Sequence, residues 1–450
     1  MVLLVALAAV WLGAAALRPG KAPAVVATSD LPGIGPLTRV SVLASEPDRG
    51  LARLKIELVQ QDLEEVLFDQ EYEPLAPWSF WGERTGVQDV VVEVGRDLQK
   101  GLKEGEAVVR VSAWSAPAWL RRRAPTVEEL VLPVRLKAPL LQILSSQHYI
   151  AQGGAEAVVY RVGATSVRDG VEVGDWWFPG YPLPGGGDQD RFALFAAPYD
   201  SSDPTAIRLV TADDVGNSFG RSFVDQFFSR PMRSDDVRLS EAFMAKVVPE
   251  ILAQSPEISD QGDLLANYLA INGDLRRMNG ETLAELGEDS DAAFAWNSVF
   301  LPMPNAQVMS AFADHRTYRF NGEVVDQQDH LGFDLASVKR ASIPAANAGR
   351  VVLARYFGIY GYSVVVDHGY GLQSLYAHLS ELRVAEGETV ERGQAVGASG
   401  ETGLAGGDHL HFTMLLHGLA ISPKEWWDEH WLQDRLVRKL GDSLPFESLH

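Results

Sequence analysis

The chain contains no cysteine among its 450 residues, so it can form no disulfide and offers no thiolate to a metal or a substrate. Any metal ion must therefore be held by histidine, aspartate or glutamate. Basic residues are also few, because 39 lysines and arginines stand against 60 acidic residues, for a formal net charge of -21. Nucleic acids and anionic membrane surfaces attract basic proteins, so this composition predicts no nucleic-acid partner.

The length of the chain exceeds what one hydrophobic core usually supports, which predicts two to four domains. Hydrophobic residues make up 46% of the chain and charged residues 22%, as is typical of folded soluble domains. We therefore expect a multidomain protein that is ordered over most of its length.

The first 17 residues are apolar without interruption, and Arg18 and Lys21 follow them. Such a run predicts an export signal or an N-terminal membrane anchor over residues 1–21, although here the positive charges follow the apolar run. A buried first helix or strand is the alternative. Residues 22–37, rich in proline, alanine and glycine, are expected to form a linker. An envelope location, periplasmic or extracellular, follows from the export signal or anchor.

Short alternating runs dominate residues 38–138, for example from Leu51 to Val59, and glycine turns separate them. This pattern predicts an antiparallel β-sandwich of immunoglobulin-like type. Residues 139–230 show similar runs and are expected to form a second immunoglobulin-like domain. Its single histidine, His148, is interpreted as an ordinary core or surface residue.

The period changes after residue 238, where apolar residues recur at helical spacing and Ser240 is placed to cap a helix. We expect a helical connector over residues 238–295, interrupted near Asn272 and Asn279. Residues 300–430 are glycine-rich with strand patterns and predict a compact antiparallel β domain, followed by a C-terminal tail over 431–450. The fold class is therefore mainly β.

Nine of the ten histidines lie after residue 300, and four of these nine lie in three short motifs. His330 precedes Asp334 by four residues, His378 lies in a second motif, and His409 and His411 flank one leucine. Residues two apart on a strand point to the same face, so the last two imidazoles should face one site together. The alternative is that these are unrelated core and surface histidines. That alternative explains poorly why three histidine motifs lie in one region of the chain.

Imidazole and carboxylate are ligands suited to Zn²⁺, and three protein ligands plus water are usual in a catalytic zinc site. His330 and Asp334 can approach an ion from a loop that leads into a strand. His409 and His411 can supply two further nitrogens, or one ligand and one acid–base group. The motifs thus predict a Zn²⁺ centre in the C-terminal domain.

The order of these motifs, from Met309 to Trp427, resembles that of the lysostaphin-type zinc metalloendopeptidases, which hydrolyse peptidoglycan peptides. The motifs are His330-Leu-Gly-Phe-Asp334, Tyr376-Ala-His378-Leu and His409-Leu-His411-Phe. The resemblance implies that His330, Asp334 and His411 are the zinc ligands. It also implies that His378 and His409 are the two catalytic histidines that do not bind the metal.

The sequence departs from the family at one place ahead of the first ligand motif. The family often has Phe-Gly-x-Arg there, whereas this chain has Phe312-Ala-Asp-His-Arg316, with no glycine and one extra residue. The departure concerns the local loop and leaves the ligand positions intact.

The function implied is hydrolysis of peptide cross-links in peptidoglycan by a metal-activated water, with His378 and His409 moving protons or stabilising the oxyanion. A non-catalytic regulator of other wall hydrolases and a wall-binding envelope protein are the alternatives. Retention of all five site residues favours the enzyme. The helical connector could also pack over the site and restrain it.

Several remaining residues match no ligand position. Asp408 could orient the neighbouring His409 ring, but a solvated carboxylate is the preferred interpretation. The other histidines are expected to be structural or surface residues: His315, His368, His417, His430 and His450.

Overall fold

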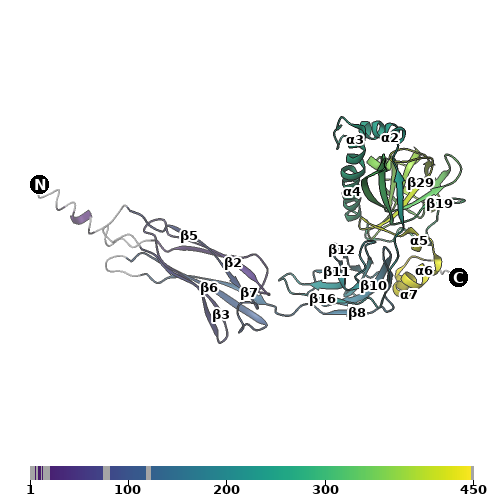
Figure 1. The fold of residues 1–450 in the computed structure, drawn as a ribbon. Helices are drawn as coiled ribbons and strands as arrows, with labels where there is room; N and C mark the ends of the chain where they lie inside the picture. The colour runs from purple at the N-terminus through teal and green to yellow at the C-terminus, as the bar shows by residue number, and fades with distance from the viewer. Residues whose placement is uncertain are drawn as a thin grey trace. The chain divides into compact units, whose positions relative to one another are not determined.

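The computed structural model describes residues 6, 9–11, 13, 21–73, 82–117 and 123–446 (Figure 1). The chain divides into two compact units, the first made of Met1–Leu140, Ala164–Val167 and Thr211–Phe219, and the second of the rest. Most of the expected signal or anchor at 1–21 lies outside the described residues, and so does His450. Among the helices described, none combines the length and apolar character needed to cross a bilayer.

The first unit is a sandwich of two antiparallel sheets, with strand orders β1-β2-β5 and β4-β3-β6-β7. Alternate residues point inward, so that Val40 and Val42 of one sheet and Ile56 and Leu58 of the other are fully buried in a shared core. The predicted sandwich is confirmed, and its immunoglobulin-like class stays a prediction. The strands are β1 (Ala24–Ser29), β2 (Thr38–Ser45), β3 (Leu51–Gln60), β4 (Leu63–Glu71), β5 (Val87–Val94), β6 (Gly105–Ser115) and β7 (Thr126–Val134).

The expected linker over residues 22–37 is wrong for most of its length. Strand β1 pairs with β2 along six residues, and Ile34 is fully buried in the sandwich core. Composition misled here, because the prolines flank the strand and do not interrupt it, and Val25 and Ala27 pack inward.

The second unit begins with another pair of four-stranded sheets, ordered β13-β14-β10-β8 and β12-β11-β15-β16, which we call the second β module. A short parallel pair, β17 with β9, lies beside them. His148 is buried there, as expected of a structural histidine. Its Nε2 contacts Ser145 Oγ, and its backbone N donates to Oδ2 of Asp225. The strands are β8 (Leu141–Ile143), β9 (Tyr149–Ala151), β10 (Ala155–Val162), β11 (Arg168–Val173), β12 (Trp176–Pro179), β13 (Tyr181–Pro182), β14 (Asp190–Ala196), β15 (Ile207–Ala212), β16 (Ser218–Ser222) and β17 (Gln226–Phe228).

The helical connector forms as predicted, with α2 (Glu241–Gln254), α3 (Leu264–Ala270), the π-helical turn η2 (Ile271–Leu275) and α4 (Arg276–Glu288). Ser240 caps α2, because its Oγ accepts a hydrogen bond from Phe243 N at 3.2 Å. The predicted interruption near Asn272 appears as η2, whereas α4 runs through Asn279 without a break. These helices share a small core with Tyr318 and Ile359 of the C-terminal β domain.

The C-terminal β domain is built on a ten-stranded sheet, whose main path is β19-β22-β29-β26-β25-β24-β27. A smaller sheet, β18-β20-β21, includes β18 (Ser234–Arg238), which precedes the helices in sequence. The strands are β19 (Gln307–Ser310), β20 (Asp314–Phe320), β21 (Glu323–His330), β22 (Phe333–Ala336), β23 (Ser342–Pro344), β24 (Gly349–Tyr356), β25 (Tyr362–Asp367), β26 (Leu372–Leu382), β27 (Thr389–Val390), β28 (Ala395–Ser399), β29 (Leu410–Leu416) and β30 (Leu419–Ile421).

The two faces of this large sheet have different neighbours. Leu410, Phe412 and Met414 of β29 belong to a core that continues into the second β module, so the two parts share one hydrophobic interior. The opposite face carries Leu375 and Leu415 and is covered in part by α4. His411 lies on this second face, because it alternates with the core residues.

The expected tail over 431–450 is wrong where the structure describes it. The helices α5 (Pro423–Trp426), α6 (Glu429–Leu432) and α7 (Arg438–Leu440), with η4 (Gln433–Val437) between the last two, end at the short turn η5 (Gly441–Ser443). Leu432, Leu436 and Leu440 are buried in the continuous core, and α7 contacts β10 of the second β module, as the yellow helices in Figure 1 show. The segment is a structural part of the second unit.

Candidate metal centre

Three side chains converge on one point of the C-terminal β domain: His330, Asp334 and His411. Oδ1 of Asp334 lies 2.9 Å from Nε2 of His330 and 3.0 Å from Nδ1 of His411. The two imidazole nitrogens lie 2.9 Å from each other. All three residues are buried or nearly so, which makes the cluster an enclosed site.

The strands explain why these residues meet. His330 ends β21, Asp334 lies in β22, and the register of β22 with β29 places Asp334 directly opposite His411. Gly332 lies between the first two, and a Cβ there would come within 2.6 Å of the His411 ring and of Thr413 Oγ1. The glycine of the motif is therefore required by the close approach of the β21–β22 loop to β29.

The hydrogen bonds around the cluster fix where the ring protons lie. Nδ1 of His330 contacts the carbonyl oxygen of Ala311 at 2.9 Å, so it must donate, which leaves the lone pair on Nε2. Thr413 Oγ1 donates to Leu331 O at 2.8 Å and therefore accepts from Nε2 of His411 at 3.0 Å. The lone pair of His411 is then on Nδ1.

Three acceptor atoms thus face one another with no proton of their own to share. Such an arrangement is electrostatically unfavourable unless a cation lies among them. Two imidazoles and a carboxylate are a usual ligand set for catalytic Zn²⁺. Tetrahedral ligands bonded at roughly 2.0 Å lie ~3.3 Å apart, close to the spacing seen here. The residues present therefore fit a zinc ion.

Arg316 supports the carboxylate from the other side. Its Nη2 donates to Oδ2 of Asp334 at 3.0 Å and to Ser310 Oγ at 2.8 Å, which leaves Oδ1 facing the histidines. The arginine of the altered Phe312–Arg316 motif thus reaches the site despite the missing glycine. Outer contacts of this kind orient metal ligands and tune their affinity.

Two further histidines lie beside the cluster. Nδ1 of His378 contacts Thr402 O at 2.8 Å and Nδ1 of His409 contacts Gly407 O at 2.8 Å, so both rings donate there and keep Nε2 for the site. The two rings lie 4.9 Å apart, and His409 Nε2 is 3.4 Å from Asp334 Oδ1. His378 has a positive φ of 60°, a strained conformation common at functional sites.

Burial and mutual contacts shift the pKa values of these groups. Burial raises the pKa of Asp334, but its close contacts with His330, His409 and His411 outweigh burial and hold this pKa well below its usual range. Burial, together with the neighbouring imidazoles, lowers the pKa of His378 well below its usual value. Burial opposes but does not overcome the effect of Asp334 on His409, whose pKa is raised.

The remaining histidines of the domain are apart from the cluster. His368 is fully buried between Ala348 O and Ser374, and His417 packs against Phe178, so both are structural as expected. His315 is half-buried beside Asp329, and His430 is exposed. Asp408 accepts from Ser399 and from Arg340 N and does not contact the His409 ring in any hydrogen bond described.

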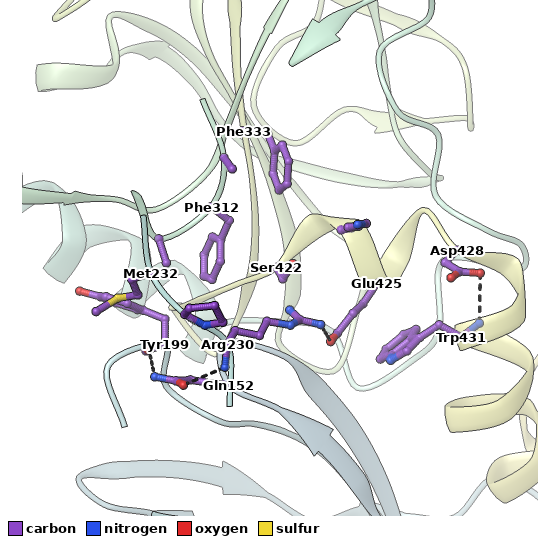
Figure 2. Close-up of a pocket in the computed structure, with 14 residues that line it drawn as sticks. Gln152, Tyr199, Arg230, Met232, Phe312, Phe333, Ser422, Glu425, Asp428 and Trp431 are labelled. Atoms are coloured by element: carbon purple, nitrogen blue, oxygen red, sulfur yellow. Dashed lines mark hydrogen bonds and ion pairs between the residues drawn. The ribbon is translucent and has the colours of Figure 1, made fainter. Parts of the chain in front are cut away.

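A cavity of about 370 Å³ lies where the second β module meets the C-terminal β domain (Figure 2). Figure 2 shows Arg230 reaching across it to the buried Glu425, an ion pair of 2.8 Å. Ala311 also lines the cavity, and its carbonyl oxygen is the one that holds His330. The cavity therefore borders the backbone that positions a ligand.

Sequence reasoning identified all five clustered residues but missed their supports. Thr413 lies two residues after His411, the spacing that puts both on one strand face, and this was the available signal. Thr402 acts through its backbone carbonyl oxygen, for which a sequence carries no signal.

The support from Thr413 can be tested by removing its hydroxyl. Thr413→Val keeps the shape and leaves Nε2 of His411 without an acceptor, so we expect zinc affinity to fall by about 10–100-fold. Competition with a fluorescent chelator measures it. Thr389→Val, at an exposed strand position, is the matched control. Unchanged affinity in Thr413→Val would show that the hydroxyl does not set the ring orientation.

An enclosed pair of imidazoles with a carboxylate, beside two more histidines, defines a hydrolytic metal centre of the metallopeptidase type. Residues 328–423 match the model of Peptidase family M23, and this match contains all five residues. The chain therefore carries a Peptidase family M23 domain.

Curated relatives extend the comparison. The chain is 28% identical to peptidoglycan DD-endopeptidase ShyA of Vibrio cholerae over 200 residues, which cover 43% of each chain. It is 29% identical to the murein hydrolase activator EnvC of Escherichia coli over 126 residues, 28% of this chain and 30% of that one. The chain thus spans less than half the length of either relative. A crystal structure described as a putative peptidase M23 from Pseudomonas aeruginosa is 18% identical, with a TM-score of 0.39, over 63% of this chain and 96% of the other.

Proposed function

We propose that this protein is a zinc-dependent endopeptidase that hydrolyses peptide cross-links of bacterial peptidoglycan in the cell envelope. The observation that carries the proposal is the convergence of three proton-free ligand atoms beside two histidines that each present Nε2. The peptidoglycan substrate is supported by the name of the Vibrio cholerae relative.

The residues suit peptide hydrolysis. His330, Asp334 and His411 would hold Zn²⁺, which when bound supplies a Lewis acid and lowers the pKa of a water molecule. Hydrolysis moves a proton from water to the leaving amine, and His378 and His409 can each accept or donate a proton at Nε2. Their Nδ1 contacts with backbone carbonyls keep both rings oriented for that task.

Retention of the whole site bears on the alternative of a non-catalytic regulator. The Escherichia coli relative is named a murein hydrolase activator, so a regulatory role exists among similar chains. A protein that only activates another hydrolase does not need five clustered residues whose imidazole rings are oriented toward one point. Their presence here favours catalysis. Binding of the cell wall by residues 38–228 and restraint of the site by the connector both stay predictions.

Digestion of purified peptidoglycan by the full chain tests the proposal. The full chain is needed because a fragment of residues 300–450 would expose the cores shared with the second β module and with α2. We expect soluble fragments with zinc and none after chelation, with recovery on adding zinc back. Mass analysis of the fragments names the bond that is cut. Release that persists in chelator would contradict the zinc dependence.

A further inference from the structure

A cavity of about 380 Å³ lies on the Arg316 side of the metal centre. Its walls come from four places: strand β18, the helical connector, strand β20 and the loop before His409, which contributes Gly406. Arg316 lines it while binding Oδ2 of Asp334, so one side chain separates the cavity from the ligand cluster. A group bound in the cavity would therefore lie next to the reacting centre.

The charge of this cavity is opposite to that of the protein. Its lining includes Arg238, Arg276 and Arg316 and no acidic residue, in a chain with a net charge of -21. Phe243 and Tyr268 add aromatic surface. A positive recess with apolar walls suits an organic anion better than a free metal or a neutral sugar.

Arg276 is the arginine of this lining that is held in place without an ion pair. It is half-buried at the start of α4, and its only hydrogen bonds among the described residues go to Asn272, at 3.0 Å to the backbone oxygen and 2.6 Å to Oδ1. No ion pair in the described part of the chain includes it, whereas Arg316 is already paired with Asp334. A carboxylate, that of Asp326, is connected to Arg276 through Asn272, whose Nδ2 donates to Oδ2 of Asp326.

These contacts orient the guanidinium without neutralising it. Asn272 is fully buried, so it holds the arginine in one position, and the planar group keeps donors for a further partner. A half-buried guanidinium held in place and without a carboxylate is what bidentate recognition of a carboxylate requires.

We infer that the cavity around Arg276 is a substrate subsite that binds a carboxylate of the peptide being cleaved. This inference rests on the proposed function and adds a specificity determinant from the connector, outside residues 328–423. Arg276 is then a binding residue for the substrate, and the connector takes part in forming the site. A peptide whose carboxylate is amidated should lose this contact.

Binding and cleavage are measured separately, so that the two proposals can fail separately. Fluorescence anisotropy on the chelator-treated full chain follows three labelled cross-linked peptides: one with free carboxylates, one amidated at the C-terminus and one amidated on its side chains. The wild type should bind the free acid about 10–100-fold more tightly than one of the amides. Which amide loses affinity identifies the carboxylate.

Variants of Arg276 and of its neighbour test whether this side chain causes the preference for the free acid. Arg276→Gln should reduce the preference to within about twofold, and Arg276→Lys should restore part of it by returning the charge. Arg277→Gln, at the exposed neighbouring position paired with Glu281, should keep the full preference. Equal binding of all three peptides by the wild type, or a preference that survives Arg276→Gln, would overturn the subsite. Lack of cleavage with zinc would instead count against the proposed function alone.

Discussion

Replacing His411 with alanine should abolish zinc retention and lower peptidoglycan hydrolysis by about three orders of magnitude or more. The metal contributes several kcal/mol to the transition state, and each ~1.4 kcal/mol is a factor of ten in rate. The loss should be severe because His411 supplies Nδ1 at the centre and also contacts Asp334 and His330. Metal content by mass spectrometry and release of soluble fragments are the two readouts.

Two other variants make the result specific. His378→Ala should keep zinc and still lose about 10²–10⁴-fold in rate, since it removes an acid–base group and no ligand. His430→Ala changes a histidine that is 88% exposed and should leave both readouts unaltered. A His411→Ala protein that retains zinc and activity would show that the convergent cluster is not the working centre.

Strand geometry made the meeting of His409 and His411 predictable, because it converts their spacing in the sequence into position, whereas the roles of the site residues rest on the family resemblance and stay predictions. His409 and His411 were expected on one side, and their nitrogens both approach Asp334 Oδ1, at 3.4 and 3.0 Å. His409 itself precedes β29, and its backbone forms an isolated antiparallel β-bridge with Gly400. His330 and Asp334 were expected on a loop that leads into a strand, whereas they lie at the end of β21 and within β22, on either side of the short loop between these strands.

The domain boundaries were harder to predict, because they depend on which apolar faces meet. The alternating runs of the second β module predict strands, and nothing in them reveals that their core continues to Leu410 and Phe412 of β29. For the same reason, the helices in residues 431–446 were not predicted. Leucines at 432, 436 and 440 follow helical spacing, but only the folded chain shows the surface that they cover.

The tail also holds a buried ion pair. Lys439 Nζ lies 2.7 Å from Oε1 of Glu156 in β10, with only 4% and 0% of the two side chains exposed. Glu156 accepts further hydrogen bonds from Ala157 N and Tyr149 N, and Lys439 donates to Ala157 O. The pair joins α7, the last α-helix among the described residues, to the second β module.

Lys439→Met should therefore lower the free energy of unfolding by about 3–5 kcal/mol, because it leaves a buried carboxylate without its cation. Urea denaturation followed by tryptophan fluorescence measures the change. Lys339→Met, at an exposed position, is the matched control and should shift it by no more than about 0.5 kcal/mol. The double variant Glu156→Gln/Lys439→Met should recover most of the loss, since glutamine is neutral and its Oε1 can still accept from Ala157 N.

The pH dependence separates loss of the charge pair from loss of packing. Burial raises the pKa of Glu156 to about 7 from 4.5, even with Lys439 opposing it, and the variant should raise it further. Below the pKa that Glu156 has in the unfolded chain, its carboxyl is protonated in the folded and the unfolded protein, so burial of the carboxyl costs no ionisation energy there. As the pH rises above that pKa, the unfolded chain ionises first, and the loss of stability caused by the variant grows. The deficit of Lys439→Met should thus be smaller near about pH 5 than near about pH 8. An equal deficit at both would mean that Lys439 stabilises the unit through its aliphatic packing, and that Glu156 is already neutral in the folded protein.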